Sequence, residues 1–241
     1  MKKKNFIRGL KDGIPIALGY LSVSFGFGIM AVQDGISPFW AVIISLTNVT
    51  SAGQVAGISL IAAGGTYIEM AVTQLVINLR YALMSLSLSQ KLDKKFTLLS
   101  RLAVSFGITD EIFAVASGRP EEVSKEYMGG LISLPVMGWV LGTLLGGVAG
   151  EILPAKINAA LGIAIYGMFI AIVVPAVKKS KGALIVVLIS VILSCCLKYI
   201  PVINKISSGF AIIICAIMGS LVGAVFFPVN VDEQAVTEDE S

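Results

Sequence analysis

Long apolar segments separated by short polar stretches occupy most of the chain. A bilayer core about 30 Å thick requires roughly 20 apolar residues for each spanning helix. Six segments come close to that length: residues 13–32, 67–89, 128–150, 157–177, 183–199 and 208–227. The pattern predicts an all-α, polytopic membrane helical bundle with six full spans.

Two further segments, residues 38–63 and 97–117, are apolar at their ends and polar or flexible in the middle. The first contains Asn48 to Gln54 at its centre, and the second contains Gly107 to Glu111. Irregular backbone at membrane depth is tolerated where protein covers it or where it lines a cavity. Both segments are therefore predicted to be broken helices, which either cross fully or dip in and return.

The distribution of Lys and Arg favours the second option. If both segments are re-entrant, fourteen of the eighteen basic residues lie on the side of the N-terminus, three lie opposite, and Arg80 lies within the membrane. If both segments cross, the split is ten to seven. Because basic residues favour the cytoplasmic side, we predict six spans plus two re-entrant or broken segments, with both termini cytoplasmic. Eight spans is the alternative.

Three regions are expected along the chain. Residues 1–12 form a basic cytoplasmic N-terminus, and residues 13–228 form the membrane domain. Residues 229–241 form an acidic cytoplasmic tail, which is too polar to build a core and is predicted to be disordered.

Composition removes several classes of function. The chain is 56% hydrophobic and 14% charged, whereas soluble domains average about 25% charged residues. There is no histidine, which excludes a Ser-His-Asp triad and a His-ligated zinc site. Cys195, Cys196 and Cys215 have neither metal nor disulfide spacing. The chain also has no Walker-type phosphate loop, and nothing in it interleaves basic with aromatic residues. From all of these absences together we expect no enzyme activity, no metal or cofactor and no nucleic-acid partner.

A few polar side chains lie inside the predicted membrane segments. A charge at the bilayer centre costs roughly 2.5–3.5 kcal/mol, so Arg80, Asp110 and Glu111 need partners or a wet cavity. Arg80 suits a carboxylate, and Asp110 or Glu111 suits an ammonium group or a coupling proton. The remaining predicted substrate-binding residues are Asn48, Ser51, Gly53, Gln54 and Asn78. This set fits a zwitterion with an apolar side chain, an amino acid. Alternatively, Arg80 and one acid form an ion pair that locks helices together.

The same residues carry a family resemblance. In order, the chain contains Ser51-Ala52-Gly53-Gln54, Asn78-Leu79-Arg80-Tyr81, Thr109-Asp110-Glu111, Asn158-Ala159-Ala160-Leu161-Gly162 and Tyr166-Gly167-Met168-Phe169. Over about residues 5–228 it resembles the AzlC family of bacterial branched-chain amino acid permeases. The resemblance implies a large subunit that works with a small AzlD-type membrane protein. Such a pair exports valine, leucine, isoleucine and analogues across the inner membrane, driven by a secondary gradient.

One position departs from the family pattern. Tyr81 stands where many members carry histidine, so proton handling shifts to Asp110 and Glu111. Two other functions are left open: export of a different small organic solute, and a scaffold role in which the partner forms most of the pathway.

Overall fold

The computed structural model describes residues 2–154, 156–157, 164–201 and 206–227. The chain divides into two compact units, residues 1–169 and 170–241, which are described separately. In the described residues the regular elements are α-helices, and the one β-bridge joins Leu92 to Val123. This confirms the all-α prediction. The predicted tail and the motif at 158–162 lie outside the described residues.

Among the described residues, five helices are long and apolar enough to span a membrane. They are α1 (Lys2–Gln33), α4 (Tyr67–Ser89), α7 (Lys125–Ile152), α10 (Lys181–Tyr199) and α11 (Ser208–Phe226). Each covers a predicted span. Helix α9 (Ala164–Lys179) occupies much of the sixth, 157–177, part of which lies outside the described residues. Helix α1 starts well before the predicted span, because Lys and Arg are good helix formers and extend it into the basic N-terminus.

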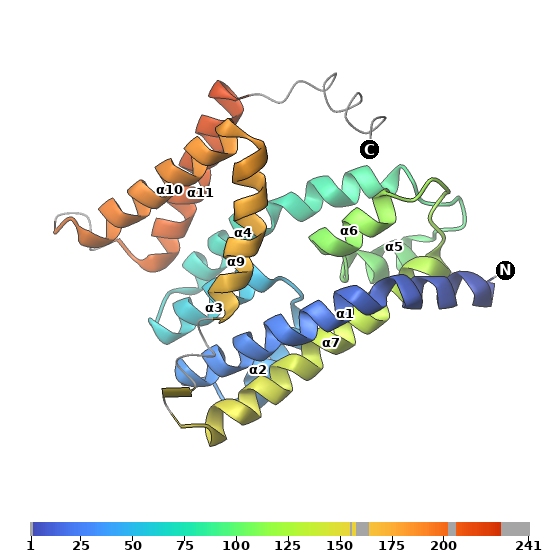
Figure 1. Cartoon of the computed structure of the whole chain (residues 1–241), viewed down its shortest axis with the longest axis horizontal. Coiled ribbons are helices and arrows are strands. Elements are labelled where there is room, and N and C mark those ends of the chain that lie inside the picture. The colour runs from blue at the N-terminus through green and yellow to red at the C-terminus, as the bar shows by residue number, and fades with distance from the viewer. Residues whose placement is uncertain (1, 155, 158–163, 202–205, 228–241) are drawn as a thin grey trace. The chain divides into compact units, whose positions relative to one another are not determined.

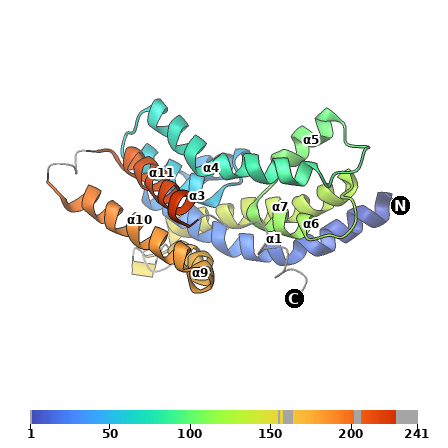
Figure 2. The same ribbon diagram turned by 90° about the horizontal axis from the view of Figure 1, so that it is seen from above.

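The first unit is built around α1 and α7, which lie side by side (Figures 1 and 2). The two helices run parallel, since Gly9 faces Tyr127 near their starts and Gly28 faces Thr143 further along. A β-carbon at Gly28 would overlap the Thr143 carbonyl oxygen. Small residues let membrane helices approach this closely, so glycine sets the spacing of the pair.

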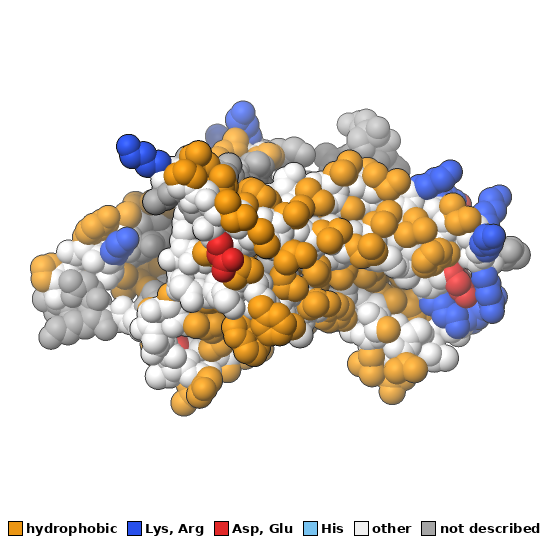
Figure 3. Space-filling model, turned by 90° about the horizontal axis from the view of Figure 1, so that it is seen from below, with side chains coloured by type: hydrophobic (Ala, Val, Ile, Leu, Met, Phe, Trp, Pro, Cys, Tyr) orange, Lys and Arg blue, Asp and Glu red, His pale blue; other side chains and the backbone are white. Residues whose placement is uncertain are grey.

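Several segments meet where α1 begins, which we call the N-terminal end. The Asn5 amide donates to Ser124 Oγ at 3.1 Å, and Val123 N–H donates to the Lys91 carbonyl at 2.8 Å. The start of α1, the loop after α4 and the loop before α7 therefore lie together. Lys and Arg side chains gather at this end in Figure 3. We call the opposite end, where α1 and α7 finish, the distal end.

The first interrupted segment is a re-entrant hairpin from the distal end. Helix α2 (Pro38–Thr47) starts beside Gly147 of α7, and α3 (Ser51–Ala62) returns so that Ile58 packs with Phe27 and Met30 of α1. At 1.5 Å per residue the two helices are ~15 and ~18 Å long, about half a bilayer core.

The second interrupted segment is a re-entrant hairpin from the N-terminal end. Helix α5 (Leu98–Ser105) follows the loop that pairs with Val123, and α6 (Asp110–Ser117) returns to the same end. There Ala116 belongs to one buried cluster with Val123 and Tyr127, and the Lys91 ammonium donates to the Ser117 carbonyl. Both segments are therefore broken helices, as predicted, and because each hairpin returns to the end it leaves, the fold agrees with the re-entrant form of the prediction rather than with the eight-span alternative.

The second unit contains the antiparallel pair α10 and α11. Gly182 near the start of α10 lies against Phe227 just after α11, and a β-carbon at Gly219 would lie 2.6 Å from Ser190 Oγ. Cys195, Cys196 and Cys215 belong to this pair as free thiols.

Candidate functional site

The breaks of the two opposed hairpins meet α4 at one pocket. Its volume is about 250 Å³. It is lined from the first break by Thr47, Asn48, Val49 and Thr50, from α4 by Asn78 and Tyr81, and from the second hairpin by Ser105, Phe106 and Ile108. Small polar groups and apolar side chains share the wall, and none of these nine residues carries a formal charge. A small solute with both polar and apolar parts fits such a lining.

Each break places the start of a half-helix at the centre of the unit. The backbone of Thr50 and of Thr109 is extended, which ends the preceding turn and starts α3 and α6 afresh. The first N–H groups of a helix have no partner within it and attract negative charge. Helix α6 carries Asp110 and Glu111 in its first turn, whereas α3 carries no acid there. The start of α3 is therefore the one left to attract an external anion.

A chain of hydrogen bonds orients the α4 side of the pocket. Thr50 Oγ1 donates to Asn78 Oδ1 at 2.6 Å, and Asn78 Nδ2 donates to Gln74 Oε1 at 3.1 Å. The Gln74 amide in turn donates to the Gly53 carbonyl at 2.7 Å. Gly53 is confined, because a β-carbon there would lie 2.6 Å from Gln74 Oε1. These bonds fix the start of α3 against α4.

Gln54 belongs to a buried network behind the pocket. Its side chain is only 1% exposed. It accepts from Trp139 Nε1 at 2.9 Å and donates to Ser45 Oγ at 3.0 Å, and Ser45 bonds Thr143 at 2.7 Å. The network clamps the α2–α3 hairpin to α7. Sequence reasoning missed its other members, although a Trp in the middle of a span, whose N–H needs a buried partner, signals such a network.

Glu111 pairs with a tyrosine from α1. The Tyr20 hydroxyl lies 2.5 Å from Glu111 Oε2, to which it donates, and 2.5 Å from Thr109 Oγ1. The Tyr20 ring packs edge-on to Trp139, with centroids 5.3 Å apart. Tyr20 therefore links the start of α6 to the buried clamp. The sequence offered no sign of this role.

Arg80 and Asp110 form an ion pair, with Nη1 and Oδ2 2.6 Å apart. Their side chains are 45% and 47% exposed. Arg80 Nη2 also lies 3.3 Å from the hydroxyl of Tyr81, which lines the pocket. The pair joins α4 to α6 beside the pocket rather than in its wall.

The predicted site residues therefore fall into separate groups. Asn48 and Asn78 line the pocket. Ser51 and Gly53 form the first turn of α3 next to it. The others sit around it, as the buried Gln54, the Arg80–Asp110 pair and Glu111 with Tyr20.

A comparison with known protein families assigns the region that contains this site to one family. The AzlC protein family model matches residues 15–153, a range that holds both hairpins and the pocket. The chain belongs to the AzlC family. The region that the AzlC model matches contains most of the α1–α7 pair and both hairpins with their breaks.

Relatives of this AzlC chain are membrane proteins. It is 29% identical over 185 residues to inner membrane protein YgaZ of Escherichia coli, covering 73% of this chain and 75% of the relative. It is 32% identical over 179 residues to an uncharacterized membrane protein of Archaeoglobus fulgidus, covering 73% and 78%. No solved structure matches. The family and these relatives support a role of the transporter type.

Proposed function

We propose that this chain is a secondary transporter subunit that exports branched-chain amino acids across a bacterial inner membrane, with both termini cytoplasmic. The observation that carries the proposal is the pocket between the two breaks. It combines the acid-free start of a helix, amide side chains and apolar walls. Discontinuous helices that meet at the midplane are a recurring design of solute sites in transporters.

The pocket suits the parts of such a solute. The carboxylate binds at the start of α3, beside Asn48 and Thr50. The ammonium group points toward α6 and its acids. The aliphatic side chain contacts Val49 and Ile108, which supply apolar surface.

The remaining members of the site have supporting roles. Ser51, Gly53 and Gln54 shape the start of α3. Arg80 neutralises Asp110 beside the pocket, and Asp110 or Glu111 carries the coupling proton. The small AzlD-type membrane protein implied by the family resemblance completes the exporter.

The test is efflux of labelled valine from preloaded cells. The chain is expressed alone, with its small partner, and as Asn78→Leu, which removes the amide that Thr50 bonds. Leu79→Ala is the matched control, because Leu79 is one residue further along α4 and does not line the pocket. We expect efflux from the pair, little from Asn78→Leu, and near-normal efflux from the control.

Equal membrane levels of all variants are required for this comparison. Wild-type efflux of another small solute, with none for valine, leucine or isoleucine, contradicts the substrate assignment. Normal valine efflux by Asn78→Leu contradicts the site.

A further inference from the structure

A second cavity adjoins the central pocket. It has a volume of about 170 Å³ and lies between α4 and α5. The two cavities share Ser105 and Ile108 in their walls. The second reaches Leu92, whose bridge to Val123 lies at the N-terminal end. Asn78 lines the first cavity and Ser89, at the end of α4, lines the second. These two residues are ~16 Å apart at helical rise, so together the cavities follow α4 from its middle to the N-terminal end of the unit.

One face of α4 lines both cavities. Asn78, Tyr81, Ser85 and Ser89 contribute to them. Their spacing of three or four residues places them on one side of the helix. The other side exposes apolar residues such as Leu83, which is 69% exposed. A polar face on a membrane helix is expected to meet protein or water rather than lipid.

The distal side of the central pocket is bounded by the α2–α3 hairpin. Ile58 and Leu60 of α3 are 1% and 2% exposed, and Phe27 of α1 is fully buried. The clamp through Gln54 holds this hairpin against α7. The pocket is therefore sealed by tight packing on one side and continued by a cavity on the other.

Arg101 on α5 stands in the wall of the second cavity, and of the described residues it is the sole charged one that lines either cavity. Within the described part of the chain Arg101 has no ion pair, unlike Arg80. A single cation at the mouth of an otherwise uncharged passage raises the local concentration of anionic groups.

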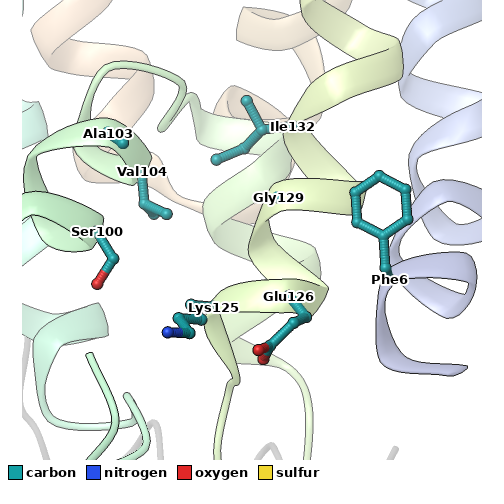
Figure 4. Close-up of a pocket in the computed structure, with 8 residues that line it drawn as sticks. All are labelled: Phe6, Ser100, Ala103, Val104, Lys125, Glu126, Gly129 and Ile132. Carbon is teal, nitrogen blue, oxygen red and sulfur yellow. The ribbon is translucent and has the colours of Figure 1, made fainter. Parts of the chain in front are cut away.

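A larger groove on the other side of α5 has a different character (Figure 4). Its volume is about 420 Å³, and Phe6, Val104 and Ile132 form much of its wall. Lys125 and Glu126 lie together at one side of it. It shares no lining residue with the central pocket and only the apolar Val104 with the second cavity.

We propose that the cleft between α4 and α5 is the passage by which a small carboxylate-bearing solute reaches the central pocket from the N-terminal end. Arg101 receives the carboxylate, and Ser85, Ser89 and Ser105 replace water along the way. The fold described here is the state open to that end. The inference rests on the proposed function for the identity of the solute, but not for the position of the passage.

Cysteine accessibility tests the passage directly. Cys195, Cys196 and Cys215 are first replaced by alanine, and single changes Ser85→Cys and Ser105→Cys are then made. A negatively charged, membrane-impermeant thiol reagent is applied to inside-out and right-side-out vesicles. Lys3→Cys reports which vesicle side carries the N-terminus. Leu86→Cys is the matched control, because Leu86 neighbours Ser85 in sequence but is 64% exposed on the other face.

We expect Ser85→Cys and Ser105→Cys to react at least about tenfold faster than Leu86→Cys, and from the same side as Lys3→Cys. Saturating valine slows the reaction of Ser105→Cys, which borders the central pocket. Reaction at the rate of the control, or from the opposite side, overturns the passage. Fast reaction from the expected side without protection by valine, leucine or isoleucine keeps the passage and removes the proposed substrate.

A second measurement addresses Arg101. Arg101→Gln is expected to raise the half-saturating solute concentration by roughly threefold to tenfold with little change in maximal rate. Arg101→Lys keeps the positive charge and is expected to leave the half-saturating concentration close to that of the unchanged protein. An unchanged half-saturating concentration in Arg101→Gln removes the role given to this residue.

Discussion

The Arg80–Asp110 pair offers a double-mutant cycle that separates its structural from its transport role. Exposed ion pairs contribute about 0.2–1 kcal/mol, and breaking a buried pair costs about 3–5 kcal/mol. Because these side chains are 45% and 47% exposed, we expect an intermediate loss. Arg80→Gln or Asp110→Asn should each lower the free energy of unfolding by about 1–3 kcal/mol.

The double variant should recover much of that loss, because two neutral amides leave no unpaired charge at this depth. The coupling energy is therefore expected to be about 1–2 kcal/mol. It is measured by unfolding the detergent-solubilised protein with dodecyl sulfate and following helical content by circular dichroism. Arg101→Gln is the control, because Arg101 has no ion pair in the described part of the chain. It should change the free energy of unfolding little.

A coupling energy within about 0.3 kcal/mol of zero would refute the ion pair, since independent sites add to that precision. The same variants then report on transport. If the double variant is stable but exports no valine, the charges act in transport. If it exports normally, the pair only holds α4 to α6.

Three further perturbations test the packing around the site. Gly28→Ala should destabilise by about 1–3 kcal/mol, because the new β-carbon meets the α7 backbone. Gly19→Ala, with open space around it, should be neutral or slightly stabilising in the same unfolding assay, and equal losses would refute the tight contact. Gln54→Leu leaves the Trp139 N–H unpaired and should cost about 1–3 kcal/mol, accompanied by a shift of tryptophan fluorescence; an unchanged spectrum and stability would contradict the clamp. Arg119→Gln removes a guanidinium that stacks 3.9 Å over the Tyr127 ring at the N-terminal end, and it should lower the free energy of unfolding by about 1–2 kcal/mol. Arg8→Gln breaks an ion pair with Glu121 whose side chains are 57% and 58% exposed, and it should lower the free energy of unfolding by less than about 1 kcal/mol.

Hydropathy alone located the helices of this protein with good accuracy. In lipid, a segment must satisfy its backbone hydrogen bonds within itself, so apolar length reports directly on a spanning helix. The same reasoning placed the two breaks, because Asn48 and Thr109 lie where an unbroken membrane helix would be apolar. Helix α4 begins and ends where the apolar run does.

The direction of the two interrupted segments was less well determined. In the sequence, the preference for re-entry depended on four basic residues, Lys91, Lys94, Lys95 and Arg101. The structure decided it through contacts between distant segments, such as Val123 with Lys91.

The partners of the polar residues came only from the tertiary structure. Gln54 and Trp139 are 85 positions apart in the chain. The spacing of residues within one helix does not tell which face of another helix that helix packs against. The same holds for Tyr20 with Glu111 and for Arg80 with Asp110. Sequence determined which polar groups must be buried in the membrane, because burial costs them hydration. Only packing decided which of them satisfy one another and which, like Asn48, face the pocket.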